Sequence, residues 1–215
     1  MMIRLMLIPL GALALSACTY QSVVQVAPAF DVYTSYNDVI PGDWYLYVDT
    51  DDLKIENVRF AGFHCSAHTY PLDMSETFSQ SAVRTVNNIV ENVMLVDNPI
   101  PQAQIERDGY AGQIMLIGEE IDADFILHQG FWTSNVEAQV DLTLAIVVDG
   151  QGDRLLGTIV SGDAEVTRDA GQFCGGAAVA LGEAASEAVH DTLQRAAERI
   201  GNAPRIREKF GDLDS

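Results

Sequence analysis

The chain has 215 residues, 48% of them hydrophobic, and a formal net charge of −19 at pH 7. This hydrophobic content indicates a globular protein rather than a disordered one, and the length suffices for one domain with a sizeable core. Because phosphate groups repel an acidic surface, the charge argues against nucleic acid and against anionic lipid headgroups as binding partners.

Residues 1–17 have the three parts of a secretory signal peptide, which are a positive charge at Arg4, an apolar core and small residues before the cleavage point. Polar residues follow Cys18 directly, and this argues against a retained membrane-spanning helix, which needs about 20 apolar residues. The sequence has no second apolar run of that length. We therefore predict that this segment is removed on export.

Leu15-Ser16-Ala17-Cys18 resembles the lipobox of bacterial lipoprotein precursors. The resemblance implies cleavage before Cys18, lipidation of that cysteine including a palmitate-type acyl chain, and a protein held to a membrane by its N-terminus. Position 19 is Thr, whereas Asp there resembles an inner-membrane retention signal, so the outer membrane is favoured, with the domain facing the periplasm. The inner membrane and the cell surface stay open. An ordinary signal peptide that happens to leave Cys18 first is the alternative.

The first part of the mature chain lacks periodicity. Residues 18–42 are polar and irregular, and we expect a flexible tether between the lipid and the domain. Strands are predicted at residues 44–48 and 55–63, which are rich in aromatic and β-branched side chains. A helix is then predicted to begin at a capping box formed by Asp73 and Glu76.

The apolar stripe of that helix extends to about Val93, before a proline-containing loop. Short strands are predicted at residues 114–117 and from residue 125. Residues 138–148 alternate apolar and polar side chains without interruption, which indicates a half-buried antiparallel strand. A hairpin returns the chain through residues 155–166, and a long alanine-rich helix covers residues 177–200.

These elements predict an α+β domain over residues 43–203, followed by a C-terminal tail at residues 204–215. The expected architecture is a single, largely antiparallel sheet of about five or six strands with two helices packed on one face.

The run Ala123-Asp124-Phe125-Ile126-Leu127-His128-Gln129-Gly130, the following hairpin and the alanine-rich helix resemble small periplasmic lipoprotein domains. These are the YajG-like lipoproteins, the TolB N-terminal domain and the curli-secretion lipoprotein. The resemblance implies a domain that binds other envelope components and carries no catalytic residues. The insert that contains Cys65 departs from that pattern.

Lipidation of Cys18 would leave Cys65 and Cys174 in a compartment that permits disulfides, and the simplest arrangement of such a pair is one bridge. Two unpaired thiols are the alternative. His64-Cys65-Ser66-Ala67-His68 is a compact set of soft metal ligands. A fourth ligand is not nearby in the sequence, so we expect no metal or other cofactor, and His64 and His68 stay as candidates for a metal or small ligand.

The sequence contains no G-x-S-x-G nucleophile motif. Glu119, Glu120, Asp122 and Asp124 are clustered carboxylates of the kind that glycoside cleavage uses, so a wall-polymer hydrolase is a further alternative. Clustered acids are also expected by chance in so acidic a chain. We therefore expect no enzyme, but a lipid-anchored accessory or assembly subunit that binds another protein of the cell envelope.

Overall fold

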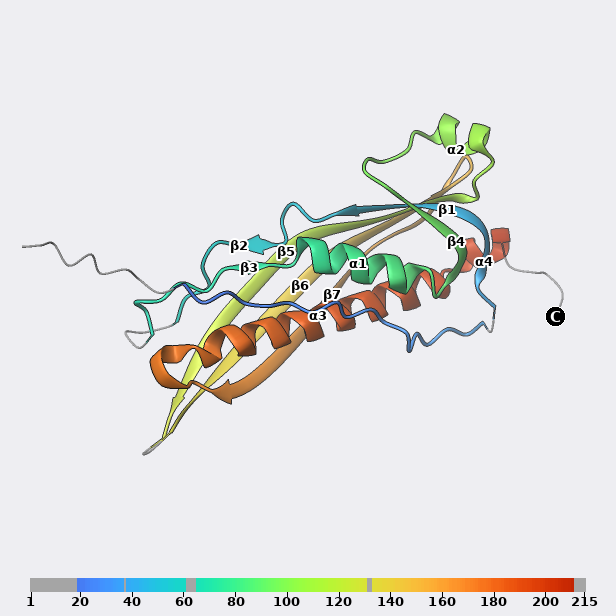
Figure 1. The fold of residues 1–215 in the computed structure, drawn as a ribbon. Coiled ribbons are helices and arrows are strands. Elements are labelled where there is room, and N and C mark those ends of the chain that lie inside the picture. The colour runs from blue at the N-terminus through green and yellow to red at the C-terminus, as the bar shows by residue number, and fades with distance from the viewer. Residues whose placement is uncertain (1–18, 37, 61–64, 131–132, 211–215) are drawn as a thin grey trace, which may run out of the picture.

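The computed structural model describes residues 19–36, 38–60, 65–130 and 133–210. Its main sheet has five strands in the order β4-β1-β5-β6-β7. The two longer helices lie on one side of this sheet (Figure 1). The strands are β1 (Ile40–Asp49), β4 (Val90–Val96), β5 (Gly112–Gln129), β6 (Ser134–Gly150) and β7 (Arg154–Asp169).

Outside the main sheet, the long elements are the two helices that lie on one side of it, and the others are short. A second sheet pairs β2 (Lys54–Ile55) with β3 (Leu72–Asp73). The helices are α1 (Ser75–Val86), α2 (Gln102–Asp108), α3 (Gly176–Gly201) and α4 (Pro204–Phe210), with a 3-10 turn, η1, at Gln172–Cys174. Among the described residues, no helix has the length and apolar content needed to cross a membrane.

The α+β class is confirmed, but the prediction of a largely antiparallel sheet holds only for β5, β6 and β7. The central strand β1 pairs in parallel with both of its neighbours, β4 and β5, so the sheet is mixed. Parallel neighbours need a crossover connection, and here α1 lies in the chain between β1 and β4. The described chain also has four helices instead of the expected two.

The prediction of a helix as far as Val93 is wrong in its second half. The helix begins at Ser75, whose N–H donates to Asp73 Oδ1, and ends at Val86. Val90 and Val93 continue the helical spacing of apolar residues, yet they belong to β4. The open edge of β1 supplies backbone hydrogen-bond partners to this valine-rich segment, and that pairing overrides the local pattern.

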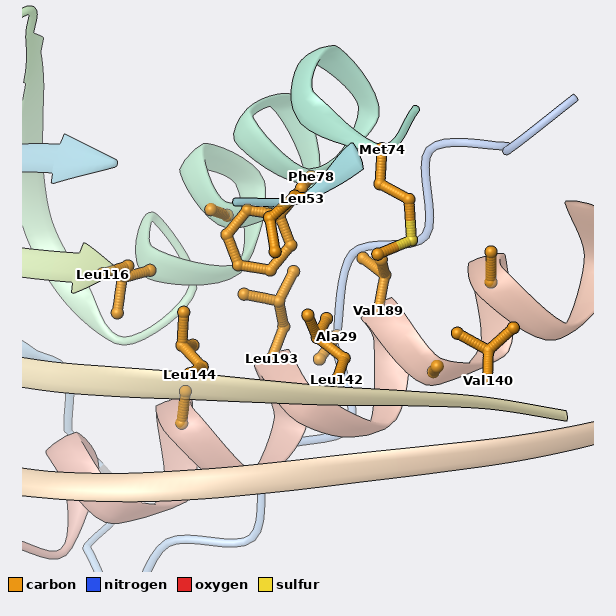
Figure 2. Packing of buried hydrophobic residues seen from close by; sticks show 14 of the residues in the cluster. Ala29, Leu53, Met74, Phe78, Leu116, Val140, Leu142, Leu144, Val189 and Leu193 are labelled. Atoms are coloured by element: carbon orange, nitrogen blue, oxygen red, sulfur yellow. The ribbon is translucent and has the colours of Figure 1, made fainter. Parts of the chain in front are cut away.

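The core lies between the sheet and the helices α1 and α3. Alternate residues of β6 are fully buried, and Figure 2 shows Val140, Leu142 and Leu144 on the side that faces Val189 and Leu193 of α3. The alternation predicted for residues 138–148 is therefore confirmed. Small residues let α3 approach closely: an added Cβ on Gly162 of β7 would lie 2.4 Å from Thr192 Oγ1.

Residues 19–36, here named the N-terminal strap, lie as an extended segment over α1 and α3 (Figure 1). Backbone N–H groups of the strap donate to hydroxyls of both helices: Gln25 to Ser186 Oγ at 2.8 Å, and Ala27 to Ser81 Oγ at 2.9 Å. Ala29 is fully buried in the core. The segment expected to be a flexible tether is thus packed onto the domain.

The strap was expected to be free because its sequence lacks a sustained apolar period, yet its side chains as well as its backbone pack on the domain, since Ser22, Val24 and Ala29 are buried. The expected C-terminal tail, residues 204–215, is also part of the fold, because α4 lies within it. Arg207 of α4 is largely buried and donates to Gly201 O at 2.7 Å and to Asp38 O at 2.9 Å. The Phe210 ring lies 5.1 Å from the Trp44 ring of β1.

Candidate functional site

The face of β5, β6 and β7 that points away from α1 and α3 is here named the open face. Side chains alternate between the two faces of a strand, so residues next to the buried Val140 and Leu142 point outward. Asp141 is such a residue, and its directly paired neighbours are Asp122 on β5 and Asp163 on β7. All three side chains are exposed.

More carboxylates lie in the adjoining rows of the open face. Asp124 pairs with Gln139, which in turn pairs with Glu165, and Glu120 pairs with Thr143. We name the whole set the carboxylate rows; it comprises Glu120, Asp122, Asp124, Glu137, Asp141, Asp163 and Glu165. Directly opposite like charges on paired strands are destabilising, so this arrangement costs the free sheet some stability.

In the described part of the chain, Glu137 is the member of this set that has a basic partner. Its Oε2 lies 2.8 Å from His128 Nε2 on β5. This hydrogen bond with His128 lowers the pKa of Glu137. Gln139 Nε2 also donates a hydrogen bond to Glu137. The negative charge of Glu137 is therefore better compensated than the charges in the central row of aspartates.

An apolar band borders the carboxylate rows on the same face. Ile117 of β5 pairs with Ala145 of β6, which in turn pairs with Ile159 of β7. Ile159 is 63% exposed. The next row contains Tyr47, Met115 and Val147, which are partly buried. The open face therefore offers apolar and anionic groups side by side.

The carboxylates proposed for hydrolysis lie on this face. Glu119 is the extra residue at an irregularity in the pairing of β5 with β6, while Glu120, Asp122 and Asp124 lie on the open face, and all four are exposed. A groove of about 670 Å³ lies instead between β7 and the C-terminal half of α3. Its lining includes Ile159, Arg195 and Arg199, and none of those four acids.

The predicted disulfide is confirmed: Cys65 and Cys174 are bonded, with their Cα atoms 5.8 Å apart. An oxidised Cys65 offers no thiolate to a metal. His64 lies outside the described residues, and the ring of His68 makes an edge contact with Tyr20 at 5.2 Å. Within the described ranges, no group of three or more His, Cys, Asp or Glu is arranged to hold a metal ion.

Cys18, the predicted lipid site, lies outside the described residues, but the residue that follows it is part of the fold. Thr19 forms a β-bridge with Thr69, and Thr69 Oγ1 donates to Thr19 Oγ1 at 2.9 Å. Tyr20 N–H donates to Thr69 O at 2.9 Å. The start of the strap is therefore fixed beside the disulfide, an arrangement that no pattern in the sequence predicted.

No family model and no curated protein matches the chain. Several solved structures are similar to it. A Xanthomonas campestris protein of the DUF330 family is 12% identical over 89% of this chain and 96% of that one, with a TM-score of 0.41. A neuraminyllactose-binding hemagglutinin homologue from Helicobacter pylori is 10% identical over 87% of this chain and 98% of that one, with a TM-score of 0.47.

A minor lipoprotein from Acinetobacter baumannii is 14% identical over 76% of this chain and 93% of that one, with a TM-score of 0.38. At these identities and scores, the similarities show neither a family nor a function for this chain.

Proposed function

We propose that the protein is a lipid-anchored envelope protein, held in the outer membrane through Cys18, that binds another envelope protein and catalyses no reaction. The observation that carries the binding role is the open face, where an apolar band lies directly beside the carboxylate rows. The lipobox-like sequence at residues 15–18 supports the anchor.

The chemistry of the open face favours a partner that is both basic and apolar. Asp122, Asp141 and Asp163 repel one another across neighbouring strands, and Lys or Arg side chains of a partner would relieve that repulsion. Apolar side chains of the same partner would cover Ile159. A second copy of the chain would instead bring like charges together, so the open face disfavours self-association.

The exposure of the acids supports a non-catalytic role. Pairs of catalytic carboxylates commonly lie in two different environments that drive their pKa values apart. Asp122 and Asp141 instead share one environment, since both are exposed and they are directly paired in the same row. Bulk solvent screens exposed charges, so the row suits partner recognition better than proton transfer.

A photo-activated cross-linking residue at Ile159 tests the binding surface in intact cells. We expect a discrete cross-linked envelope protein, and a strongly reduced yield when Asp141→Lys is added. The matched control places the cross-linker at Val179, which is 54% exposed on α3 in the layer on the other face of the sheet. Equal yields at the two positions, or no product at Ile159, would overturn the proposal.

The anchor is tested separately by metabolic labelling with an alkyne fatty acid. Label is expected on the native protein and absent from Cys18→Ser. Separation of the two membranes on a density gradient then decides the location, and label in the inner-membrane fraction alone would contradict the outer-membrane assignment.

A further inference from the structure

We propose that the disulfide end of the domain sits directly on the lipid surface, so that the anchor fixes the orientation of the domain as well as its location. The disulfide end is defined here by Thr19, Tyr20, Cys65, Tyr70 and the η1 turn. This inference rests on the proposed lipidation of Cys18.

The anchor is joined to the fold without a free linker. Consecutive Cα atoms are about 3.8 Å apart, so a lipid-bearing Cys18 is one residue from the bridge between Thr19 and Thr69. A free tether over residues 19–42 could have reached about 80 Å. The hydrogen bonds to Ser81 and Ser186 hold the strap against the helices, so it does not extend over that distance.

The attachment point is held by packed aromatic rings. The Tyr20 ring stacks on Tyr70 with centroids 5.8 Å apart, and Tyr70 OH donates to Cys174 O at 3.1 Å. Gly175 leaves room for this packing, because an added Cβ there would lie 3.3 Å from the Tyr20 ring. The disulfide from Cys174 to Cys65 closes the cluster.

The disulfide end also carries an exposed aromatic side chain. Phe173 of η1 is 77% exposed, although it is next to the disulfide. An aromatic side chain in that position can enter the boundary between headgroups and acyl chains. The carboxylate rows lie on the side of the sheet, so a lipid surface at the end of the domain does not face them.

This orientation determines where the other elements lie relative to the membrane. Figure 1 shows the start of the strap, the start of α3, the end of β5 and the start of β6 at one end, and α2 and α4 at the other. β5 has 18 residues and therefore spans about 60 Å. The open face then stands upright on the membrane and is accessible from the side to a partner in the same membrane.

Lipidated full-length protein in vesicles of phosphatidylethanolamine and phosphatidylglycerol tests the orientation. A fluorescent amino acid replaces Phe173 in one sample and Ala103 of α2, an exposed residue at the far end, in the other. With quencher groups on the lipid headgroups, we expect quenching to be several-fold stronger at residue 173. Equal quenching at both positions would overturn the proposal.

A linker variant separates the effect of the short connection from any intrinsic affinity of Phe173 for lipid. Inserting about 20 glycine and serine residues between Cys18 and Thr19 restores slack. The quenching difference is expected to fall several-fold, and an unchanged difference would overturn the role of the short connection. If Cys18 is not lipidated, the result differs from both of these outcomes. The native protein would then not bind the vesicles, which is also the result expected for Cys18→Ser.

Discussion

Thr85 of α1 accepts a hydrogen bond through its Oγ1 from the backbone N–H of Ala29, at 2.9 Å, and both residues are buried. The contact joins positions 56 residues apart in the chain. It belongs to a series in which hydroxyls of α1 and α3 replace water as partners of the strap backbone. The strap is thus an integral part of the domain, and its loss would expose part of the core.

Thr85→Val tests this contact, because it keeps the shape of the side chain and removes the acceptor. The buried N–H of Ala29 would lose its partner, and we expect the free energy of unfolding to fall by about 1–3 kcal/mol. Urea denaturation measures the change. Thr85→Ser keeps the hydroxyl and is the control; equal stability of the two variants would show that this hydrogen bond does not hold the strap.

Gly182→Ala tests the close approach between α3 and the strap. An added Cβ would lie 2.3 Å from the carbonyl oxygen of Val23, so the strap must shift. Alanine normally stabilises a helix interior by about 1 kcal/mol relative to glycine. We expect the opposite here, with faster hydrogen exchange at Gln25 and Ala27.

The control for that variant is Gly157→Ala on β7, where the nearest atom to the added Cβ is Arg154 Cδ at 3.8 Å. Exchange rates of the strap should stay unchanged in this control. Unaltered exchange at Gln25 in Gly182→Ala as well would show that the strap can adapt to the side chain without loosening.

Reduction of the Cys65–Cys174 bond should lower the free energy of unfolding by about 2–5 kcal/mol, since the bond closes a long loop of the unfolded chain. The paired residues are separated by 109 positions. Denaturation with and without reductant measures the effect. The double variant Cys65→Ser with Cys174→Ser should not respond to reductant, and an identical midpoint for the reduced native protein would contradict the prediction.

Tyr70 predicts a loss of stability at alkaline pH. Burial raises the pKa of Tyr70 to about 12, from an ordinary value of 10.0. The folded state therefore favours the neutral phenol, so this contribution to stability is complete below pH 10 and is lost as the pH rises through about 12. Tyr70→Phe should show a smaller decline over that interval in pH-dependent denaturation.

Some alkaline decline should remain in Tyr70→Phe, because burial also raises the pKa of Tyr45 and of Tyr47. An unchanged slope in the variant would mean that Tyr70 does not carry the effect.

Asp141→Asn should stabilise the free protein. It removes the central charge of a row in which Asp122 and Asp163 are the direct neighbours. We expect a gain of about 0.2–1 kcal/mol at low ionic strength. The gain should shrink in concentrated salt, which screens exposed charges. Asp97→Asn, an exposed acid in the loop after β4, is the control, and a gain of equal size there would show a general effect of net charge.

The sequence by itself determined the elements whose side chains alternate or repeat. The alternation at residues 138–148, the partner strand and the alanine-rich helix match β6, β7 and α3. The cysteine count and the export signal predicted the pairing of Cys65 with Cys174, with two unpaired thiols as the alternative, and the structure confirms the bond. The acids of β5 were visible as a cluster in the sequence.

Only the tertiary structure decided the rest, because the decisive contacts join backbone groups that are distant in the chain. Val90 and Val93 fit a helical spacing, and pairing with β1 made them a strand. The strap shows no sustained apolar period in the sequence, and the partners of its N–H groups are the hydroxyls of Ser81, Thr85 and Ser186, which are distant in the chain. Strand register likewise brought Asp141 and Asp163 beside Asp122, and with them formed the open face.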